Sequence, residues 1–214
     1  MIFLEMFSGS KTISKAFENV GFEVYNIDWE EEYEPTLCAN IFELTSNDIE
    51  EHIGQNPDVI WASPDCTKFS FASGEKNEFR KGNTKPLTRE ARRAVYLVKH
   101  TLMMINCLKP TYWFLENPLH GALKNMDFMK QYAYVDVNYC RYGSKNQKAT
   151  RIWGNFPPSF RPKSHCYHIK HQLELKDIAG AHNRAIMPIE LGHDLAESCA
   201  LDNGLQIMTL KEWI

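Results

Sequence analysis

Short apolar runs and longer amphipathic stretches follow one another along the chain and predict strands and helices in alternation. The runs at residues 2–6, 23–27 and 58–62 are short and bounded by turn residues, as buried strands are. After the first run, apolar side chains recur at 13, 16, 17 and 20 with helical spacing, and Gly21 marks the helix end. A strand, a tight turn, a helix and a second strand predict a parallel sheet with a right-handed crossover.

The remainder of the chain continues this pattern, so the predicted fold class is α/β with helices on both faces of the sheet. Glycine, proline and many charges over 71–87 predict a loop, and 157–183 is irregular. The further elements that the pattern predicts are helices over 49–53, over 89–108 and from Pro188, and strands over 112–115, over 133–139 and from Arg151.

Composition narrows the class of protein. The chain has 214 residues, of which 43% are hydrophobic and 24% charged, as in an ordinary globular domain. Residues 1–6 are apolar but lack a basic lead, so we expect a strand there rather than a signal peptide. No apolar run reaches the length of a membrane span, so no membrane partner is expected. Six scattered cysteines without a CxxC pair indicate reduced thiols and a cytoplasmic protein.

Charge is distributed unevenly along the chain. The net charge of −3 does not by itself indicate nucleic-acid binding. Acidic residues cluster over 28–34, whereas basic residues cluster over 76–93 and 141–170. One basic side could bind a polyanion despite the acidic total, although solvated loops explain the same pattern. The loop residues available to phosphates are Lys76, Arg80, Lys81 and Lys85.

A thiol and a carboxyl follow two of the predicted strands. Cys66 comes shortly after the strand over 58–62, and Glu116 directly follows the strand over 112–115. Side chains at the ends of two such strands can converge on one small substrate. A thiolate that adds to a ring, with an acid at a ring nitrogen, is chemistry suited to a pyrimidine. The alternative for Cys66 alone is a packed core residue.

The opposite half of the predicted sheet suggests a nucleoside cofactor. A glycine in the first turn allows close backbone approach, an acidic residue ending the second strand can take a ribose diol, and the tryptophan after it offers a flat face to adenine. No Gly-x-Gly-x-x-Gly turn is present, so S-adenosylmethionine fits better than NAD. Taken singly, these residues are also consistent with a solvated strand end and a core aromatic. The residues concerned are Phe7, Ser8, Gly9 and Ser10, then Asp28 and Trp29, and finally Asn40 and Ile41 at the purine edge.

These motifs together resemble the DNA cytosine-5 methyltransferases over roughly residues 2–156. Each motif is weak alone, but six occur in the family's order. The matching segments are Leu4-Glu5-Met6-Phe7-Ser8-Gly9-Ser10, Asp28-Trp29, Asn40-Ile41, Pro64-Asp65-Cys66-Thr67-Lys68-Phe69-Ser70, Glu116-Asn117-Pro118, and Tyr142-Gly143 with Gln147-Lys148-Ala149-Thr150-Arg151.

The resemblance implies an S-adenosylmethionine-dependent methyltransferase with a Rossmann-like sheet that acts on a cytosine flipped out of DNA. It implies that Cys66 is the nucleophile, that Glu116 acts at N3 and the exocyclic amine, and that Arg151 acts at O2. It also places Pro64 in the cofactor pocket and Gln147 against DNA. The expected organisation is a catalytic domain over 1–156, a reduced target-recognition segment over 157–183, and a C-terminal helix over 184–214 that returns to the domain.

Several positions depart from the family pattern. Lys11 stands for the second glycine, Asp65 for a proline, Thr67 for a glutamine and Ala149 for an arginine. The short recognition segment resembles compact forms carried by bacteriophages, which would place the enzyme in a host cytoplasm. The alternatives left open are the same chemistry on RNA, an idle DNA-binding protein that keeps the fold, and an amino-group methyltransferase, whose motif lacks its aromatic here.

The segment after residue 164 is rich in potential metal ligands. Their spacing fits no common zinc finger, and no second cysteine pair stands near in the sequence. No metal is therefore expected, and a small basic segment in contact with DNA is the preferred interpretation. The residues are His165, Cys166, His168 and His171.

Overall fold

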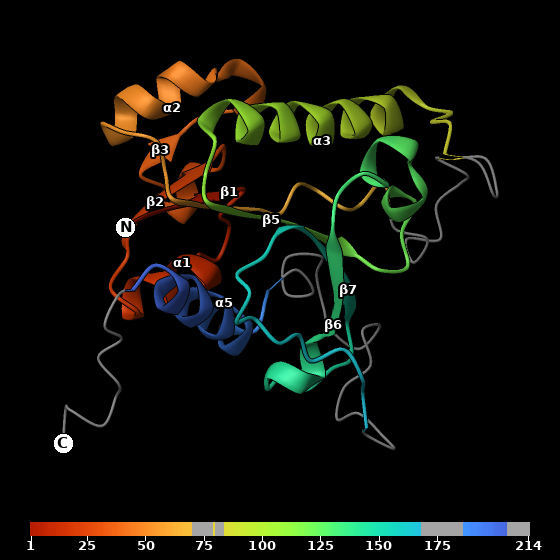
Figure 1. The fold of residues 1–214 in the computed structure, drawn as a ribbon. Helices are drawn as coiled ribbons and strands as arrows, with labels where there is room; N and C mark the ends of the chain where they lie inside the picture. Colours follow the sequence, from red (N-terminus) through yellow and green to blue (C-terminus); the bar gives the residue numbers. More distant parts are fainter. Residues whose placement is uncertain (70–78, 80–83, 168–185, 205–214) are drawn as a thin grey trace.

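The computed structural model describes residues 1–69, 79, 84–167 and 186–204 and contains a seven-stranded sheet of order β3-β2-β1-β4-β5-β7-β6 (Figure 1). Among the described residues, no helix has the length and apolarity that crossing a membrane requires. The strands are β1 (Ile2–Met6), β2 (Glu23–Asp28), β3 (Leu37–Cys38), β4 (Val59–Ala62), β5 (Tyr112–Pro118), β6 (Tyr134–Asn138) and β7 (Ala149–Asn155). The α-helices are α1 (Thr12–Asn19), α2 (Ser46–Ile53), α3 (Arg89–Leu108) and α5 (Ile189–Asp202).

The strands β1 to β5 run parallel, whereas β7 is antiparallel to both β5 and β6. The predicted α/β class and the helix over 89–108 are confirmed. The strand predicted over 112–115 is longer than expected, because β5 continues through Glu116 and Asn117 to Pro118. The prediction stops at residue 115 because the apolar run ends there. Pairing with β7 supports this polar extension. The catalytic carboxyl candidate therefore lies inside a strand.

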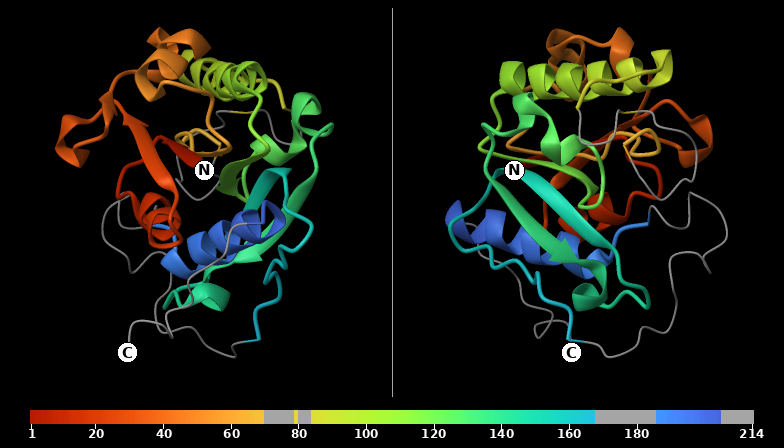
Figure 2. Two further views of the ribbon diagram at one scale, coloured as in Figure 1. Left: turned by 60° about the vertical axis from the view of Figure 1, so that its left-hand side comes forward. Right: turned by 90° about the vertical axis from the view of Figure 1, so that its right-hand side faces the viewer.

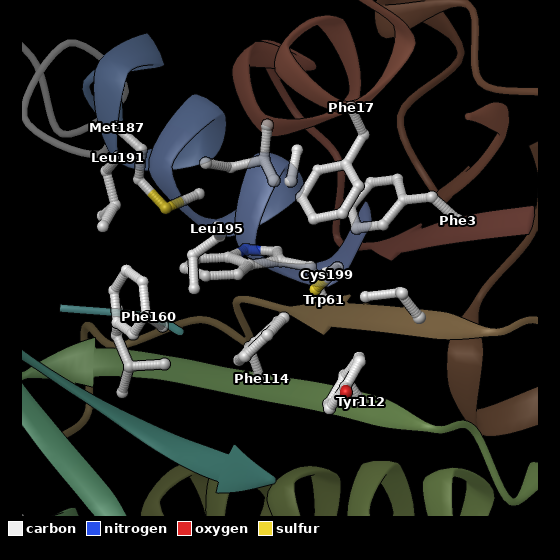
Figure 3. Close-up of a cluster of buried hydrophobic side chains, with 14 of the residues drawn as sticks. Phe3, Phe17, Trp61, Tyr112, Phe114, Phe160, Met187, Leu191, Leu195 and Cys199 are labelled. Carbon is white, nitrogen blue, oxygen red and sulfur yellow. The ribbon is translucent and has the colours of Figure 1, made fainter. Parts of the chain in front are cut away.

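Helices cover both faces of the sheet (Figures 1 and 2). Successive β1 side chains point to opposite faces, so Phe3 packs with α1 and α5 while Leu4 packs with α2 and α3. Figure 3 shows the first of these layers, in which Phe17 and Leu195 meet Trp61 and other aromatic side chains of the sheet. Both faces of the central strands are thus buried, as in parallel sheets generally.

The helix α5, near the C-terminal end of the described chain, lies directly against α1, near its N-terminal end. A Cβ at Gly192 would lie 2.6 Å from the Cβ of Ala16, so the two helices approach closely through small residues. Residues 157–167 contain no helix or strand, yet Phe160 is buried in the same core layer. The Lys163 amide donates to the hydroxyl of Tyr142 at 2.9 Å. The first part of the predicted recognition segment is therefore packed onto the domain.

The carboxyl of Glu5 links β1 to α1. Its Oε2 accepts hydrogen bonds from the Ser14 amide at 2.9 Å and the Ser14 hydroxyl at 2.5 Å. Burial and, to a smaller extent, the charge of Asp28 raise the pKa of Glu5 from 4.5 to about 7, although the Ser14 hydrogen bonds lower it. Lys11 opposes that rise. Folding therefore favours the protonated carboxyl.

Gly154 should be intolerant of any side chain, because its Cβ would lie 1.9 Å from the Trp113 carbonyl oxygen. We expect Gly154→Ala to lower the free energy of unfolding by roughly 3 kcal/mol, at the upper end for overpacking, because the added methyl group clashes with backbone between β5 and β7. Gly54→Ala is the matched control, since Gly54 has φ +88° but open space at its Cβ, and should lose about 1 kcal/mol. Urea denaturation measures both losses, and equal losses would contradict the steric explanation.

Glu5 should make the protein less stable as pH rises. Its contribution favours folding fully below about pH 4.5 and is lost as the pH climbs through about 7, because the folded state binds the proton more tightly. Relative to Glu5→Gln, the wild type should lose roughly 3 kcal/mol of unfolding free energy between pH 4.5 and 8. Urea melts at four pH values test this, with Glu51→Gln on an exposed face of α2 as control. Parallel curves for wild type and Glu5→Gln would refute the shifted pKa.

Candidate active site

The carboxyl ends of β1, β4 and β5 meet at one edge of the sheet. Met6 is in register with Ala62, and Ala62 with Leu115, so the residues that follow each strand emerge together. The Ser63 hydroxyl donates to the carbonyl of Phe7 at 3.3 Å. The Asn117 side-chain amide donates to the carbonyl of Pro64 at 3.3 Å. These bonds fasten the first turn, the Cys66 loop and the end of β5 to one another.

The loop that carries Cys66 is anchored on both sides of the thiol. The Phe69 amide donates to the Cys66 carbonyl at 3.0 Å, and the Phe69 ring is buried in the layer beneath α3. Asp65 accepts hydrogen bonds from the amide and the hydroxyl of Thr67 at 2.9 and 2.7 Å. The two departures from the family motif thus form a local pair that shapes the turn.

The charge of Glu116 acts on the Cys66 thiol. Burial raises the pKa of the Cys66 thiol and the charges of Glu116 and Asp65 add to the rise, whereas Lys148 lowers it, so that the pKa is about 11. Glu116 is itself buried within β5. The thiol is therefore protonated near neutral pH in the unliganded protein, and its activation depends on neighbouring charge.

Two further side chains that the sequence analysis did not assign complete this cluster. The hydroxyl of Tyr139 donates to Glu116 Oε1 at 3.2 Å, and Lys148 Nζ lies 3.6 Å from the same oxygen. Burial and the Glu116 charge hold the pKa of Tyr139 well above its usual range. Lys148 stands within the matched run 147–151, directly before β7, but only the folded structure shows that it reaches Glu116.

Arg151 is not brought to this cluster. Its guanidinium donates to both carboxylate oxygens of Asp136, at 2.6 and 2.8 Å, and lies 3.6 Å from the ring centroid of Tyr134. On β7 it pairs with Asn117, whereas Ile152 pairs with Glu116. Alternation along the strand turns its side chain to the other face of the sheet. The role at cytosine O2 that the resemblance implies for Arg151 stays a prediction, since Asp136 and not Glu116 holds its guanidinium here.

The first turn and the end of β2 form the predicted cofactor end. Phe7 and Gly9 have φ of 63° and 43°, a left-handed conformation that favours glycine and often occurs where a turn serves a ligand. The Gly9 amide donates to Asp28 Oδ2 at 2.9 Å, so the buried carboxylate holds the turn in place. Trp29 beside it is 70% exposed, and its flat face is available for stacking.

Unpartnered polar atoms line this turn. Ser8 Oγ and Glu5 Oε1 are buried without a hydrogen-bond partner, and a Cβ at Gly9 would meet no atom within 4 Å. Buried polar atoms normally find partners, so these two indicate the position of a polar ligand. The residues fit a cofactor with a nucleoside and an amino-acid end, as S-adenosylmethionine has.

The other predicted cofactor residues are engaged locally. Asn40 caps the turn that follows it, accepting from the Phe42 amide at 3.2 Å and donating to Glu43 at 3.2 Å. Ile41 is buried, and its carbonyl lies 2.9 Å from a ring nitrogen of His100. The Ser10 hydroxyl lies 2.9 Å from the hydroxyl of Thr12.

Lys11 occupies the position of the family's second glycine in a glycine-like conformation, with φ 54° and ψ 28°. Its Nζ donates to the carbonyl of Glu34 at 2.6 Å. That bond ties the first turn to the loop beyond Trp29 and compensates part of the strain of a left-handed residue with a side chain.

The predicted DNA contacts are only partly described. Lys76, Arg80 and Lys81 lie outside the described residues. Lys85 is exposed shortly before α3. Gln147 is exposed, and its side-chain amide donates to Asn138 at 3.4 Å.

None of the six cysteines forms a disulfide. Within the described ranges, no group of three potential metal ligands is present. Cys166 instead contacts Cys140, with 3.4 Å between the sulfur atoms, and His165 stacks on Tyr167. His168 and His171 lie outside the described part of the chain.

Comparisons with known proteins point to the same family as the sequence motifs. The model of the C-5 cytosine-specific DNA methylase family matches residues 1–130. The "Probable DNA (cytosine-5)-methyltransferase" of Frog virus 3 (isolate Goorha) is 28% identical over 169 residues, which cover 77% of this chain and 74% of that protein.

Two solved structures share the fold. One, from E. coli, is described as a DNA modification methyltransferase encoded within a prophage; it has a TM-score of 0.54 and 14% identity over 83% of this chain and 53% of that chain. The other, Entamoeba histolytica methyltransferase EhMeth, has a TM-score of 0.53 and 15% identity over 78% and 57%. The chain spans about half the length of these two structures. Since the family model covers more than half of the residues and includes the Cys66 and Glu116 motifs, the chain belongs to the C-5 cytosine-specific DNA methylase family.

Proposed function

We propose that this chain transfers a methyl group from S-adenosylmethionine to C5 of cytosine in DNA through a covalent adduct with Cys66. The observation that carries the proposal is the meeting of the Cys66 loop, Glu116 and the first turn at one sheet edge. A thiol beside a buried carboxyl suits addition to a pyrimidine ring. Family membership and the printed name of the viral relative support DNA as the substrate.

Cytosine C5 is a poor nucleophile until a group adds to C6. The Cys66 thiolate forms a bond to C6, and Glu116 hydrogen-bonds N3 and the exocyclic amine, where charge changes during addition. S-adenosylmethionine supplies the methyl group that C5 takes. Loss of the C5 proton and elimination of the sulfur then release the base. Because Glu116 is only 5% exposed, the cytosine has to leave the duplex to reach it.

The chain's own residues would hold the cofactor at the first turn and the β2 end. Asp28 would bind the ribose, Trp29 would stack on adenine, and the unpartnered Ser8 hydroxyl would face the amino-acid end. The remaining residues that we assign to this pocket are Phe7, Gly9, Ser10, Asn40, Ile41 and Pro64. On the DNA side we assign phosphate contacts to Lys76, Arg80, Lys81 and Lys85, and a further contact to Gln147.

The covalent step is tested with mixed-sequence DNA in which 5-fluorocytosine replaces cytosine. Fluorine cannot leave C5 as a proton does, so wild type with S-adenosylmethionine should form an adduct that survives denaturing electrophoresis. Cys66→Ser should form none, because a serine hydroxyl is far less nucleophilic at neutral pH. Cys107→Ser, on the exposed side of α3, is the control and should behave as wild type. An adduct in Cys66→Ser would exclude this nucleophile, and an adduct with the matching RNA instead of DNA would reassign the substrate.

The cofactor end is tested with Trp29→Ala. Loss of stacking should weaken S-adenosylmethionine binding by roughly 1–3 kcal/mol, which is about 5- to 150-fold in Kd. Tyr134→Ala removes a comparably exposed aromatic side chain from β6 and should leave Kd unchanged. Titration calorimetry measures both, and an unaltered Kd in folded Trp29→Ala would show that adenine binds elsewhere.

A further inference from the structure

A buried ion pair stands beside the nucleophile. Lys148 Nζ lies 3.6 Å from Glu116 Oε1, and the two side chains are only 10% and 7% exposed. The same ammonium lies 4.8 Å from the ring centroid of Tyr139, whose hydroxyl donates to Glu116 Oε1. Lys148 is thus fixed on one side by a carboxylate and on the other by an aromatic face.

Burying two charges is unfavourable for stability, because each loses its hydration and their attraction repays this only in part. A pair of apolar residues would fill the same space at no such cost. We therefore infer that Lys148 is buried for its positive charge. Besides Glu116, the group that this charge acts on is Cys66, whose thiolate form it stabilises. Asp65 and Glu116 both disfavour the thiolate there, and Lys148 opposes them.

Arg151, the other basic residue in this region, does not supply a charge beside the thiol in this arrangement. Arg151 donates from Nε and Nη2 to the two carboxylate oxygens of Asp136 and stacks on Tyr134, on the face of the sheet away from Glu116. Position 149, where the family pattern has an arginine, is an alanine here. The charge needed beside the thiol has to come from a neighbouring position.

We propose that Lys148 is a positioning residue that supplies a fixed positive charge shared by Glu116 and Cys66, so that one negative charge can pass between them during attack on cytosine. This inference rests on the proposed methyltransferase function and assigns to Lys148 a part that neither the motif pattern nor the family match gives it.

The step balances without any added reactant. The Cys66 thiol gives its proton to Glu116 and becomes a thiolate, while Lys148 stays protonated. A sulfur electron pair forms the bond to C6, the C5–C6 π electrons shift toward C5 and the N3 end of the ring, and Glu116 passes the same proton to N3. The negative charge has then returned to Glu116, and Lys148 has faced an anion at every stage.

The test measures the thiol directly, without DNA or cofactor. Alkylation of Cys66 by iodoacetamide is followed from pH 6 to 10 by mass spectrometry of the peptide that contains it. Lys148→Gln is one atom shorter and keeps a hydrogen-bond donor but removes the charge, so the alkylation rate at pH 8 should fall about 5- to 10-fold, as the thiolate fraction does when a pKa rises by nearly one unit. Lys148→Arg should stay within about twofold of wild type.

Lys163→Gln is the matched control. Lys163 also pairs with a carboxylate, Asp194 at 2.7 Å, and lies 4.7 Å from a tyrosine ring centroid, that of Tyr142, but it does not act on Cys66. Its variant should keep the wild-type profile. Identical pH profiles for Lys148→Gln and Lys163→Gln would overturn the proposal, because a merely structural lysine would not move the thiol.

A second variant covers the case in which Lys148→Gln does not fold. Glu116→Gln removes the negative neighbour and should speed Cys66 alkylation at pH 8 by several-fold, and an unchanged rate would overturn the shared-charge arrangement. Failure of the proposed function is a separate outcome. It would show as absence of the 5-fluorocytosine adduct in wild type while the alkylation profiles still shift with Lys148.

Discussion

The parallel register of β1, β4 and β5 is the constraint on which the rest of the site depends. Three strands that end together place a turn, a thiol loop and a carboxyl within reach of one another, although more than a hundred residues separate the first from the last. The Asn117 amide, which donates to Pro64, sets the distance between the second and third of these pieces. A slip of one residue between β4 and β5 would turn Glu116 to the other face of the sheet and dismantle the site.

Burial is also the first cause of the pKa shifts of three groups at or near this edge. Because water is largely excluded, the pKa of Glu5 is raised to about 7 and that of Cys66 to about 11, and Tyr139 follows in the same direction. Such a site cannot rely on solvent to stabilise a thiolate or to protonate a ring nitrogen. It needs charges that are already in place, which is why the position of one ammonium near Glu116 matters more than the net charge of the chain.

The sequence predicts the elements whose side-chain pattern is local, and it does not predict the contacts that depend on how distant strands pair. Helical spacing predicts the helix over 89–108, and short apolar runs predict the strands at 2–6 and 58–62. The Cys66 and Glu116 motifs are recognised by their place after such runs. That Lys148 and not Arg151 lies beside Glu116 could not be foreseen, because the antiparallel pairing of β7 with β5 decides which face Arg151 takes, and that register is not visible in the sequence. Asp65 and Thr67 are two departures from the family motif in the sequence, and in the structure they form one hydrogen-bonded turn.

The same cluster bears on whether the fold is used for catalysis or kept only for binding. A protein that merely bound DNA would need its basic surface but would gain nothing from a buried carboxylate, a buried lysine and a buried tyrosine around a thiol, since each polar group removed from water weakens the fold. Replacement of Glu116 and Lys148 by apolar residues of similar volume would be tolerated or even stabilising in such a protein. Here both charged side chains are buried near Cys66, and the Ser8 hydroxyl and a Glu5 oxygen are buried without partners close by. Polar groups that are buried at a loss of stability and gathered in one place are typical of an active site.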